Sequence, residues 1–421
     1  MVIKVRYKLL EDTKLHKNGA LFLGMILKKN IYAILSAVMP GAYRLIAIYM
    51  LNMLLLSDGS DLVVSQFVLV TGLCMFSSLG ISTSYIKQAG GEELHAHANT
   101  VYITHLASLL LISLCVALAS VLFHLVPVEN AAVFTLALLA IGAYQLERHY
   151  YLASNELHKL FQMDCLLVVI TAIGFVIGPN SNGLLLIAGA NGVALLISIL
   201  ISRRYAIKGV QWYNPQTLIM GVKLGYSNLV SGGVMYILPT LMLTVASDRL
   251  VSMLSMVVAI SGAALVLPRA VFNTKIQKIA SDARDGKVDN DFYAKTNKQI
   301  GLICLLSLPA ILLLSLIYLY INGYHIMNEA PLMLGVITVM LFVLVVGQLS
   351  LLDSMLVIFL NKENVALKYN TITFVVMLLC YVGFSIFKVS SDYAIISMVA
   401  IILLILICYV VRLYKFKKVI N

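Results

Sequence analysis

Charged residues are scarce in this chain, and acidic residues are scarcer than basic ones. Only 12% of its 421 residues are Asp, Glu, Lys or Arg, whereas 61% are hydrophobic, and the mean hydropathy is +0.95. So little polar surface cannot cover a water-soluble globule of this length. The composition therefore predicts a protein whose solvent is largely the lipid bilayer.

Signatures of catalysis and metal binding are also missing. The sequence contains no HExxH, GxSxG or P-loop motif, and its six cysteines lie in apolar runs without paired spacing. We therefore expect neither an enzyme nor a cofactor or metal site. Without a nucleotide-binding domain, any active transport would draw on a proton or sodium gradient or on supply and consumption of the substrate. The net charge is +11, and the basic residues that produce it lie beside the apolar runs, where they can contact anionic lipid headgroups. Because the membrane accounts for this charge, we expect no nucleic-acid partner.

Long apolar runs predict an all-α polytopic membrane protein with about twelve transmembrane helices, because each span needs about 20 apolar residues. An even number per half favours two parallel six-helix repeats. The predicted spans are 30–56, 62–87, 100–126, 131–153, 161–179, 183–203, 217–246, 249–272, 299–321, 331–360, 367–388 and 391–412. The predicted units are an N-terminal arm (1–29), an N-lobe (30–203), an inter-lobe linker (204–216), a C-lobe (217–412) and a tail (413–421).

The distribution of basic residues predicts the orientation. Of 30 Lys and Arg, all but Arg44, Arg249 and Lys388 lie in the N-terminal arm, in or beside the C-terminal tail, or in every second gap between spans and the span ends beside it. Cytoplasmic loops retain Lys and Arg, so both termini are expected in the cytoplasm of a bacterial cell, with the chain in the inner membrane. Residues 1–24 are expected to be either an amphipathic cytoplasmic extension or a segment upstream of the true start codon. Met25, which would make an ordinary start before the first span, favours the second alternative.

Arg44 lies halfway along the first apolar run. An arginine at a helix centre costs about 2.5–3.5 kcal/mol on insertion scales, so it should face a wet cavity or a paired anion. A guanidinium group suits phosphate oxygens, which makes Arg44 a candidate substrate-binding residue. The alternative is a permanent bond to a buried acid or to helix carbonyls.

Five further charged residues are candidates for the same cavity. Lys87, Arg148 and Arg269 lie at predicted cytoplasmic ends of spans, where they either anchor the helices at the interface or concentrate a negatively charged headgroup. Asp164 and Asp353 lie inside predicted spans, where they are candidates for counter-ions or for coupling to a proton or sodium ion.

Helix-breaking residues occur in the leading helix of each lobe. Pro40 and Gly41 precede Arg44 by one turn, and Gly233 and Pro239 interrupt the seventh apolar run. Proline removes an intrahelical hydrogen bond and glycine permits bending, so these positions are candidate hinges near a transport cavity. A static kink absorbed by packing is the alternative.

The chain resembles the Wzx-type O-antigen and polysaccharide flippases of the multidrug/oligosaccharidyl-lipid/polysaccharide (MOP) exporter superfamily, which have a MATE-like fold, and its length, twelve predicted spans and cytoplasmic termini fit this family along the whole sequence. The resemblance rests on Leu27-Lys-Lys-Asn-Ile31, Arg44, Gln66-Phe67 and Gly80-Ile-Ser-Thr-Ser-Tyr-Ile86. It implies transfer of an undecaprenyl-diphosphate-linked oligosaccharide between leaflets, with Arg44 as the deep cation. Gln66 is a further candidate for substrate binding, and a polysaccharide polymerase and a chain-length regulator are candidate partners.

Two other functions remain alternatives. A drug/cation antiporter of the same superfamily would need an acidic site in its first lobe, whereas the deepest charge here is basic. A membrane polysaccharide polymerase or glycosyltransferase would need a large external loop or a catalytic pair of acids, whereas the predicted outer loops are short.

Overall fold

The computed structural model of the protein describes residues 31–51, 60–89, 94–122, 126–178, 182–202, 214–242, 266–285, 289–321, 331–386 and 394–420. Within these ranges the chain forms helices and turns and no strand, which confirms the predicted all-α class. The helices are Ile31–Leu51, α2 (Ser60–Ala89), α3 (Leu94–Leu122), the 3-10 turn η1 (Val128–Asn130), α4 (Ala131–Ala153), α5 (Leu157–Ile177), α6 (Gly183–Ser202), α7 (Pro215–Met242), α9 (Val266–Arg284), α10 (Asn290–Ile321), α12 (Pro331–Leu349), α13 (Leu351–Phe359), α14 (Glu363–Ile386) and α15 (Ala394–Ile420).

The apolar runs correspond well to these helices. Across the described ranges, nine helices are long and apolar enough to cross a membrane. Most of the predicted span 249–272 and of the predicted linker 204–216 lies outside the described residues. The predicted span 331–360 is divided into α12 and α13 by a turn at Ser350, and α15 continues to Ile420 through the segment that we expected as a tail.

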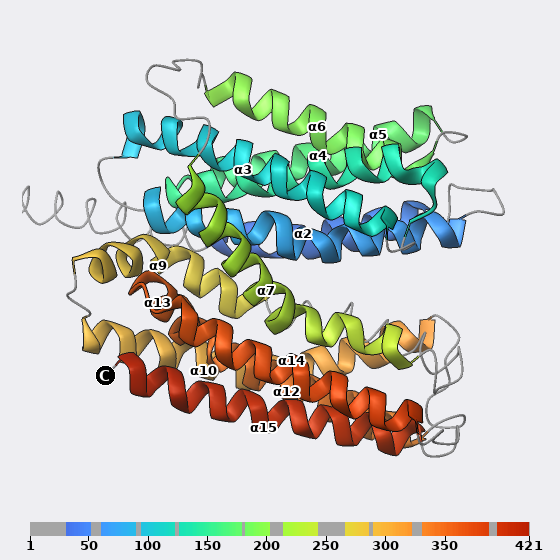
Figure 1. The fold of residues 1–421 in the computed structure, drawn as a ribbon, viewed down its shortest axis with the longest axis vertical. Coiled ribbons are helices and arrows are strands. Elements are labelled where there is room, and N and C mark those ends of the chain that lie inside the picture. Colours follow the sequence, from blue (N-terminus) through green and yellow to red (C-terminus); the bar gives the residue numbers. More distant parts are fainter. Residues whose placement is uncertain are drawn as a thin grey trace, which may run out of the picture.

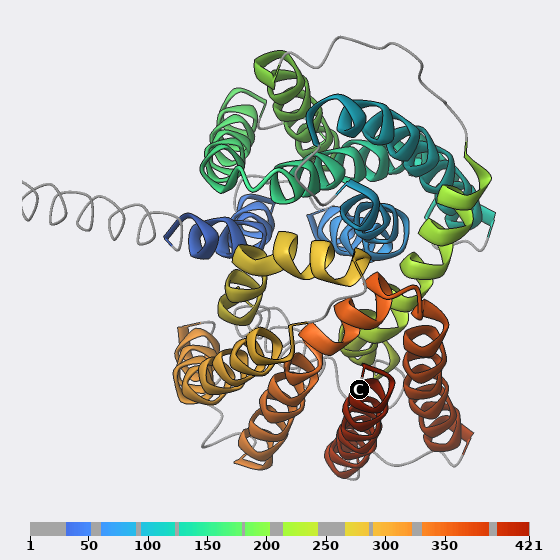
Figure 2. The same ribbon diagram turned by 90° about the vertical axis from the view of Figure 1, so that its left-hand side faces the viewer.

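The helices form two bundles with a boundary along α7 (Figures 1 and 2). The first bundle contains the Ile31–Leu51 helix and α2 to α6, and the second contains α9 to α15. Helix α7 packs most extensively against α2 of the first bundle and also against α14 of the second. It is therefore the helix through which the two bundles are joined.

Glycines allow the backbones of α2 and α7 to touch. A Cβ atom on Gly225 of α7 would overlap the carbonyl oxygen of Phe76, and one on Gly80 of α2 would overlap that of Gly221. Small residues at such crossings permit the close packing that drives helix association in membranes. The separation of the two bundles is therefore set where these glycines meet.

A single apolar core connects the bundles at one end. It contains Ile81 and Tyr85 from the C-terminal half of α2, Ile276 from α9 and Val357 from α13, all buried. These positions lie at the helix ends that the charge pattern predicts to face the cytoplasm. The bundles are therefore packed together at that end.

A buried ion pair joins α4 to α5 in the first bundle. Arg148 is only 8% exposed, and it donates to Asp164 from Nε to Oδ1 (2.8 Å) and from Nη2 to Oδ2 (3.0 Å). Nη2 also donates to the carbonyl oxygen of Ser36 (2.8 Å), and the Tyr144 hydroxyl donates to Asp164 Oδ1 (3.1 Å). This pair ties the Ile31–Leu51 helix, α4 and α5 together.

Substituting Gly225→Ala should separate α2 from α7, because the new methyl group has no space against the Phe76 backbone. We expect a loss of about 1–3 kcal/mol of stability, typical of an overpacked contact. The measurement is thermal unfolding of the purified protein. Gly189→Ala is the matched control, because nothing lies within 4 Å of its added Cβ; equal melting temperatures for both variants would contradict the tight crossing.

Substituting Arg148→Gln should lower stability by about 3–5 kcal/mol, because it leaves the Asp164 carboxylate buried without its partner. Replacing both residues with apolar ones of similar size should recover part of that loss, because no buried charge remains. Thermal unfolding of the two variants measures the difference. A double variant that is less stable than the single one would contradict this account.

Candidate functional site

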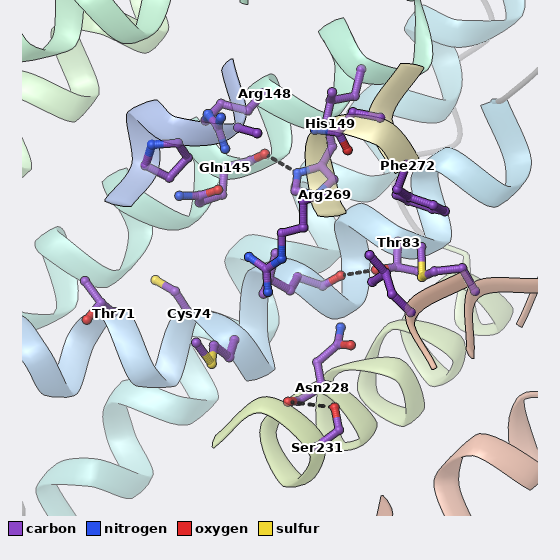
Figure 3. A pocket seen from close by; sticks show the side chains of 18 of the residues that line it. Thr71, Cys74, Thr83, Gln145, Arg148, His149, Asn228, Ser231, Arg269 and Phe272 are labelled. Carbon is purple, nitrogen blue, oxygen red and sulfur yellow. Dashed lines mark hydrogen bonds between the residues drawn. The ribbon is translucent and has the colours of Figure 1, made fainter. Parts of the chain in front are cut away.

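A cavity of about 390 Å³ lies between the two bundles. Its walls come from the Ile31–Leu51 helix, α2, α4, α5 and α6 on one side, and from α7, α9, α12, α13, α14 and α15 on the other. Its volume falls within the range of about 300–1,000 Å³ that is typical of small-molecule sites. Figure 3 shows this cavity between α2, α4, α7 and α9.

Positive charge dominates the cavity wall. The charged side chains among its described lining residues are Arg44, Arg148, Arg269, Arg412 and Asp164. Four arginines and one aspartate leave three formal positive charges. The wall is therefore suited to an anionic ligand.

Arg44 is half-buried and lines the cavity from the Ile31–Leu51 helix. Within the described part of the chain, its side chain makes no hydrogen bond or salt bridge, although it contributes to the electrostatic environment of Cys74. Arg44 therefore lines the cavity without a permanent partner among the described residues, and its contact with a substrate stays a prediction.

Arg269 reaches the cavity from the second bundle. Its side chain is exposed, and Figure 3 shows it extending from α9 into the space above Asn228 and Ser231 of α7. The sequence placed Arg269 only at the end of a span, where an interface anchor was the favoured interpretation. The fold brings it to the same cavity as Arg44.

The first bundle supplies a neutral polar wall beside Arg148 and Asp164. The Tyr43 hydroxyl accepts hydrogen bonds from Asn191 Nδ2 (3.0 Å) and Thr171 Oγ1 (3.4 Å). Arg148 and Asp164 line the same cavity, but their charges largely neutralise each other. Their first role is thus to hold the wall together.

The second bundle holds a buried arginine that sequence reasoning missed. Arg412 of α15 is 6% exposed, and its Nη1 donates to Asn370 Oδ1 (3.0 Å). Its Nη2 donates to Ser350 Oγ (2.8 Å) and to the carbonyl oxygen of Gly347 (3.4 Å). Its guanidinium carbon lies 4.4 Å from the centroid of the Tyr409 ring.

In the predicted topology Arg412 is the last residue of the span 391–412, where it was counted as a topology signal together with the basic residues of the tail. The available signal was its place between Val411 and Leu413, three residues before Lys415, which gives a basic residue inside the apolar run. Because α15 continues to Ile420, Arg412 lies two turns before the helix end and faces the cavity.

Gln66 and Lys87 are not among the residues that line the cavity. Gln66 is buried within α2. The Lys87 ammonium lies 3.6 Å from Glu363 Oε2, so it joins the end of α2 to the start of α14 across the two bundles. Their predicted contact with substrate has no support from this arrangement.

Asp353 also lies away from the cavity lining. It is fully buried in α13, and its Oδ1 accepts a hydrogen bond from Asn297 Nδ2 of α10 (3.1 Å). Its Oδ2 has no hydrogen-bond partner among the described residues. A role in ion coupling stays a prediction, and any such role would act from behind the cavity wall.

The candidate hinge residues lie inside uninterrupted helices. Pro40 lines the cavity and Gly41 is exposed on the Ile31–Leu51 helix, while Gly233 and Pro239 lie within α7. The helical assignment continues through all of them. Whether they bend during transport stays a prediction.

Solved structures share this architecture at low sequence identity. A multidrug resistance MATE family transporter of the MOP superfamily in its outward-facing conformation matches with a TM-score of 0.69 and 14% identity, over 94% of this chain and 95% of that chain. A MATE protein in complex with MaL6 matches with a TM-score of 0.67 and 15% identity over the same shares, 94% and 95%.

A MOP superfamily transporter from Pyrococcus furiosus matches with a TM-score of 0.62 and 13% identity, over 94% of this chain and 95% of that chain. It is described as having a binding pocket of reverse polarity that suggests a different function. Neither a protein-family model nor a curated protein matches the sequence. The chain thus has the fold of MATE transporters of the MOP superfamily, with a basic cavity between its bundles.

Proposed function

We propose that the protein is a flippase that moves undecaprenyl-diphosphate-linked oligosaccharide repeat units from the inner to the outer leaflet of the bacterial inner membrane. The observation that carries this proposal is the cavity between the bundles, with its four arginines and one neutralised aspartate. The repeat units would belong to O-antigen or a related surface polysaccharide.

The charge of the cavity matches the chemistry of this cargo. A diphosphate and its sugars cannot cross about 30 Å of hydrocarbon unaided, because their polar groups would lose their hydrogen bonds with water. Arginine presents planar pairs of donors that fit phosphate oxygens. Arg44 and Arg269 supply such donors from opposite bundles.

The cavity also contains groups for sugars. Asn228, Ser231 and Thr71 line it with amide and hydroxyl groups, which both donate and accept hydrogen bonds. The polyprenyl chain would stay in the bilayer while the headgroup occupies the cavity. Rocking of the two bundles would then open the cavity to one leaflet and then to the other.

A drug/cation antiporter is the second candidate, favoured by the likeness to a multidrug resistance MATE transporter. A cationic drug needs a free carboxylate in the cavity. The only carboxylate among the described lining residues, Asp164, already accepts two hydrogen bonds from Arg148. The Pyrococcus furiosus neighbour supports the idea that this fold also serves pockets of other polarity.

The enzyme alternative, a polymerase or glycosyltransferase, has weaker support. It would need a large external loop or a catalytic pair of acids. Among the described residues that line the cavity, Asp164 is the only carboxylate, and it is engaged in an ion pair. A polysaccharide polymerase and a chain-length regulator are instead proposed as partners that use the translocated units. We further propose that a proton or sodium gradient supplies the energy for translocation. Both termini would lie in the cytoplasm.

Substituting Arg44→Ala should abolish long-chain surface polysaccharide in a deletion strain complemented with the variant, because the deep cation that meets the headgroup is gone. The measurement is a gel of extracted surface polysaccharide beside an immunoblot for the protein. Arg44→Lys should retain part of the polymer, because it keeps the charge but loses the paired donors.

Lys298→Ala is the matched control for this experiment. Lys298 is an exposed base on α10 that does not line the cavity, and its loss removes one positive charge without changing the wall. Its polymer should equal that of the wild type. Unchanged polymer in Arg44→Ala, at equal protein level, would reject the role of Arg44.

A further inference from the structure

The two buried arginines of the cavity wall differ in the charge of their partners. Arg148 faces the carboxylate of Asp164, whereas Arg412 faces the neutral amide of Asn370 and the hydroxyl of Ser350. No carboxylate lies within salt-bridge distance of Arg412 among the described residues. Its full positive charge is therefore held in the wall without a counter-ion.

Arg412 also has unused hydrogen-bonding capacity. A guanidinium group has five N–H donors, and three of those of Arg412 reach Asn370, Ser350 and Gly347. Its Nε is buried and has no partner among the described residues. A buried, unsatisfied donor on a charged group is costly unless a ligand satisfies it.

The surrounding helices hold this charge in place without cancelling it. The turn at Ser350 separates α12 from α13, which brings the last carbonyls of α12 towards Arg412. A helix C-terminus carries about half a negative charge. Asn370 is fixed in turn, because its Nδ2 donates to Ser227 Oγ (2.8 Å) and so directs its oxygen at Arg412.

We propose that Arg412 is the contact in the second bundle for a phosphate group of the transported anion. This inference rests on the proposed function and assigns a residue that gives the cavity its preference for phosphate. Arg44 offers a guanidinium group from the first bundle and Arg412 offers one from the second. A diphosphate held by both Arg44 and Arg412 would link the two bundles. A ligand that drives closure of the cavity must make such a link.

The sharpest test is Asn370→Asp, which gives Arg412 the carboxylate partner that Arg148 already has. The change is nearly isosteric, and the Ser227 hydroxyl can reverse its hydrogen bond to donate to the new carboxylate. We expect the ligand-free variant to melt at or above the wild-type temperature, since the buried charge gains a counter-ion. We expect its affinity for a diphosphate to fall about tenfold or more, since the positive charge is neutralised.

The probes are farnesyl diphosphate and inorganic pyrophosphate, added to the full-length protein in nanodiscs. Binding is measured by calorimetry and by the rise in melting temperature that a ligand of the folded state produces. Arg412→Gln is the second variant, and it should also weaken binding about tenfold or more through loss of a charged donor. Lys298→Ala is the control, because it removes an exposed positive charge that does not line the cavity, and its binding should equal that of the wild type.

The outcomes separate this inference from the proposed function. Weaker binding of farnesyl diphosphate in Asn370→Asp, at an unchanged or higher melting temperature, supports the role of Arg412. Equal binding by the wild type and both variants overturns it but leaves the flippase proposal standing. If the wild type binds pyrophosphate but not farnesyl diphosphate, and Asn370→Asp weakens that binding, the phosphate site is supported and the lipid cargo is rejected. If the wild type binds neither probe, both the role of Arg412 and the flippase proposal are rejected.

Discussion

The constraint that shapes this protein is the burial of guanidinium groups with too few carboxylates beside them to balance their positive charge. Three of the four arginines in the cavity wall, Arg44, Arg148 and Arg412, are buried or half-buried and must meet that cost in some way. Arg148 is balanced by Asp164, Arg412 donates to neutral acceptors and to the end of α12, and Arg44 faces the cavity itself. The excess positive charge makes the space between the bundles a place where an anion lowers the free energy.

The packing of the bundles determines how this space can change. The glycine contact between α2 and α7 fixes one line along which the bundles meet, and the apolar core around Tyr85 and Ile276 closes them at one end. The ion pair between Lys87 and Glu363 lies across the same boundary. In the proposed rocking motion, opening of that end requires these contacts to separate. Helix α7 packs more extensively against α2 than against α14.

The helices could be predicted from the sequence because hydrocarbon thickness sets the length of apolar runs, but the site could be predicted only in part. Arg44 stood out as a charge in the middle of a run. Gln66 and Asp353 were expected at the cavity and lie elsewhere, because helices that are apolar all round carry no periodicity to show which face turns inward. Arg412 was missed because a basic residue near the end of a run has the same pattern as a topology signal.

The most direct test of this account is translocation by the purified protein in vesicles that contain a labelled undecaprenyl-diphosphate-linked oligosaccharide. Chemical modification of the label from outside reports how much headgroup has reached the outer leaflet. The account predicts that translocation is much faster than in protein-free vesicles and that an organic cation is not moved. The account would be contradicted if the protein transported the cation while the headgroup reached the outer leaflet no faster than in protein-free vesicles.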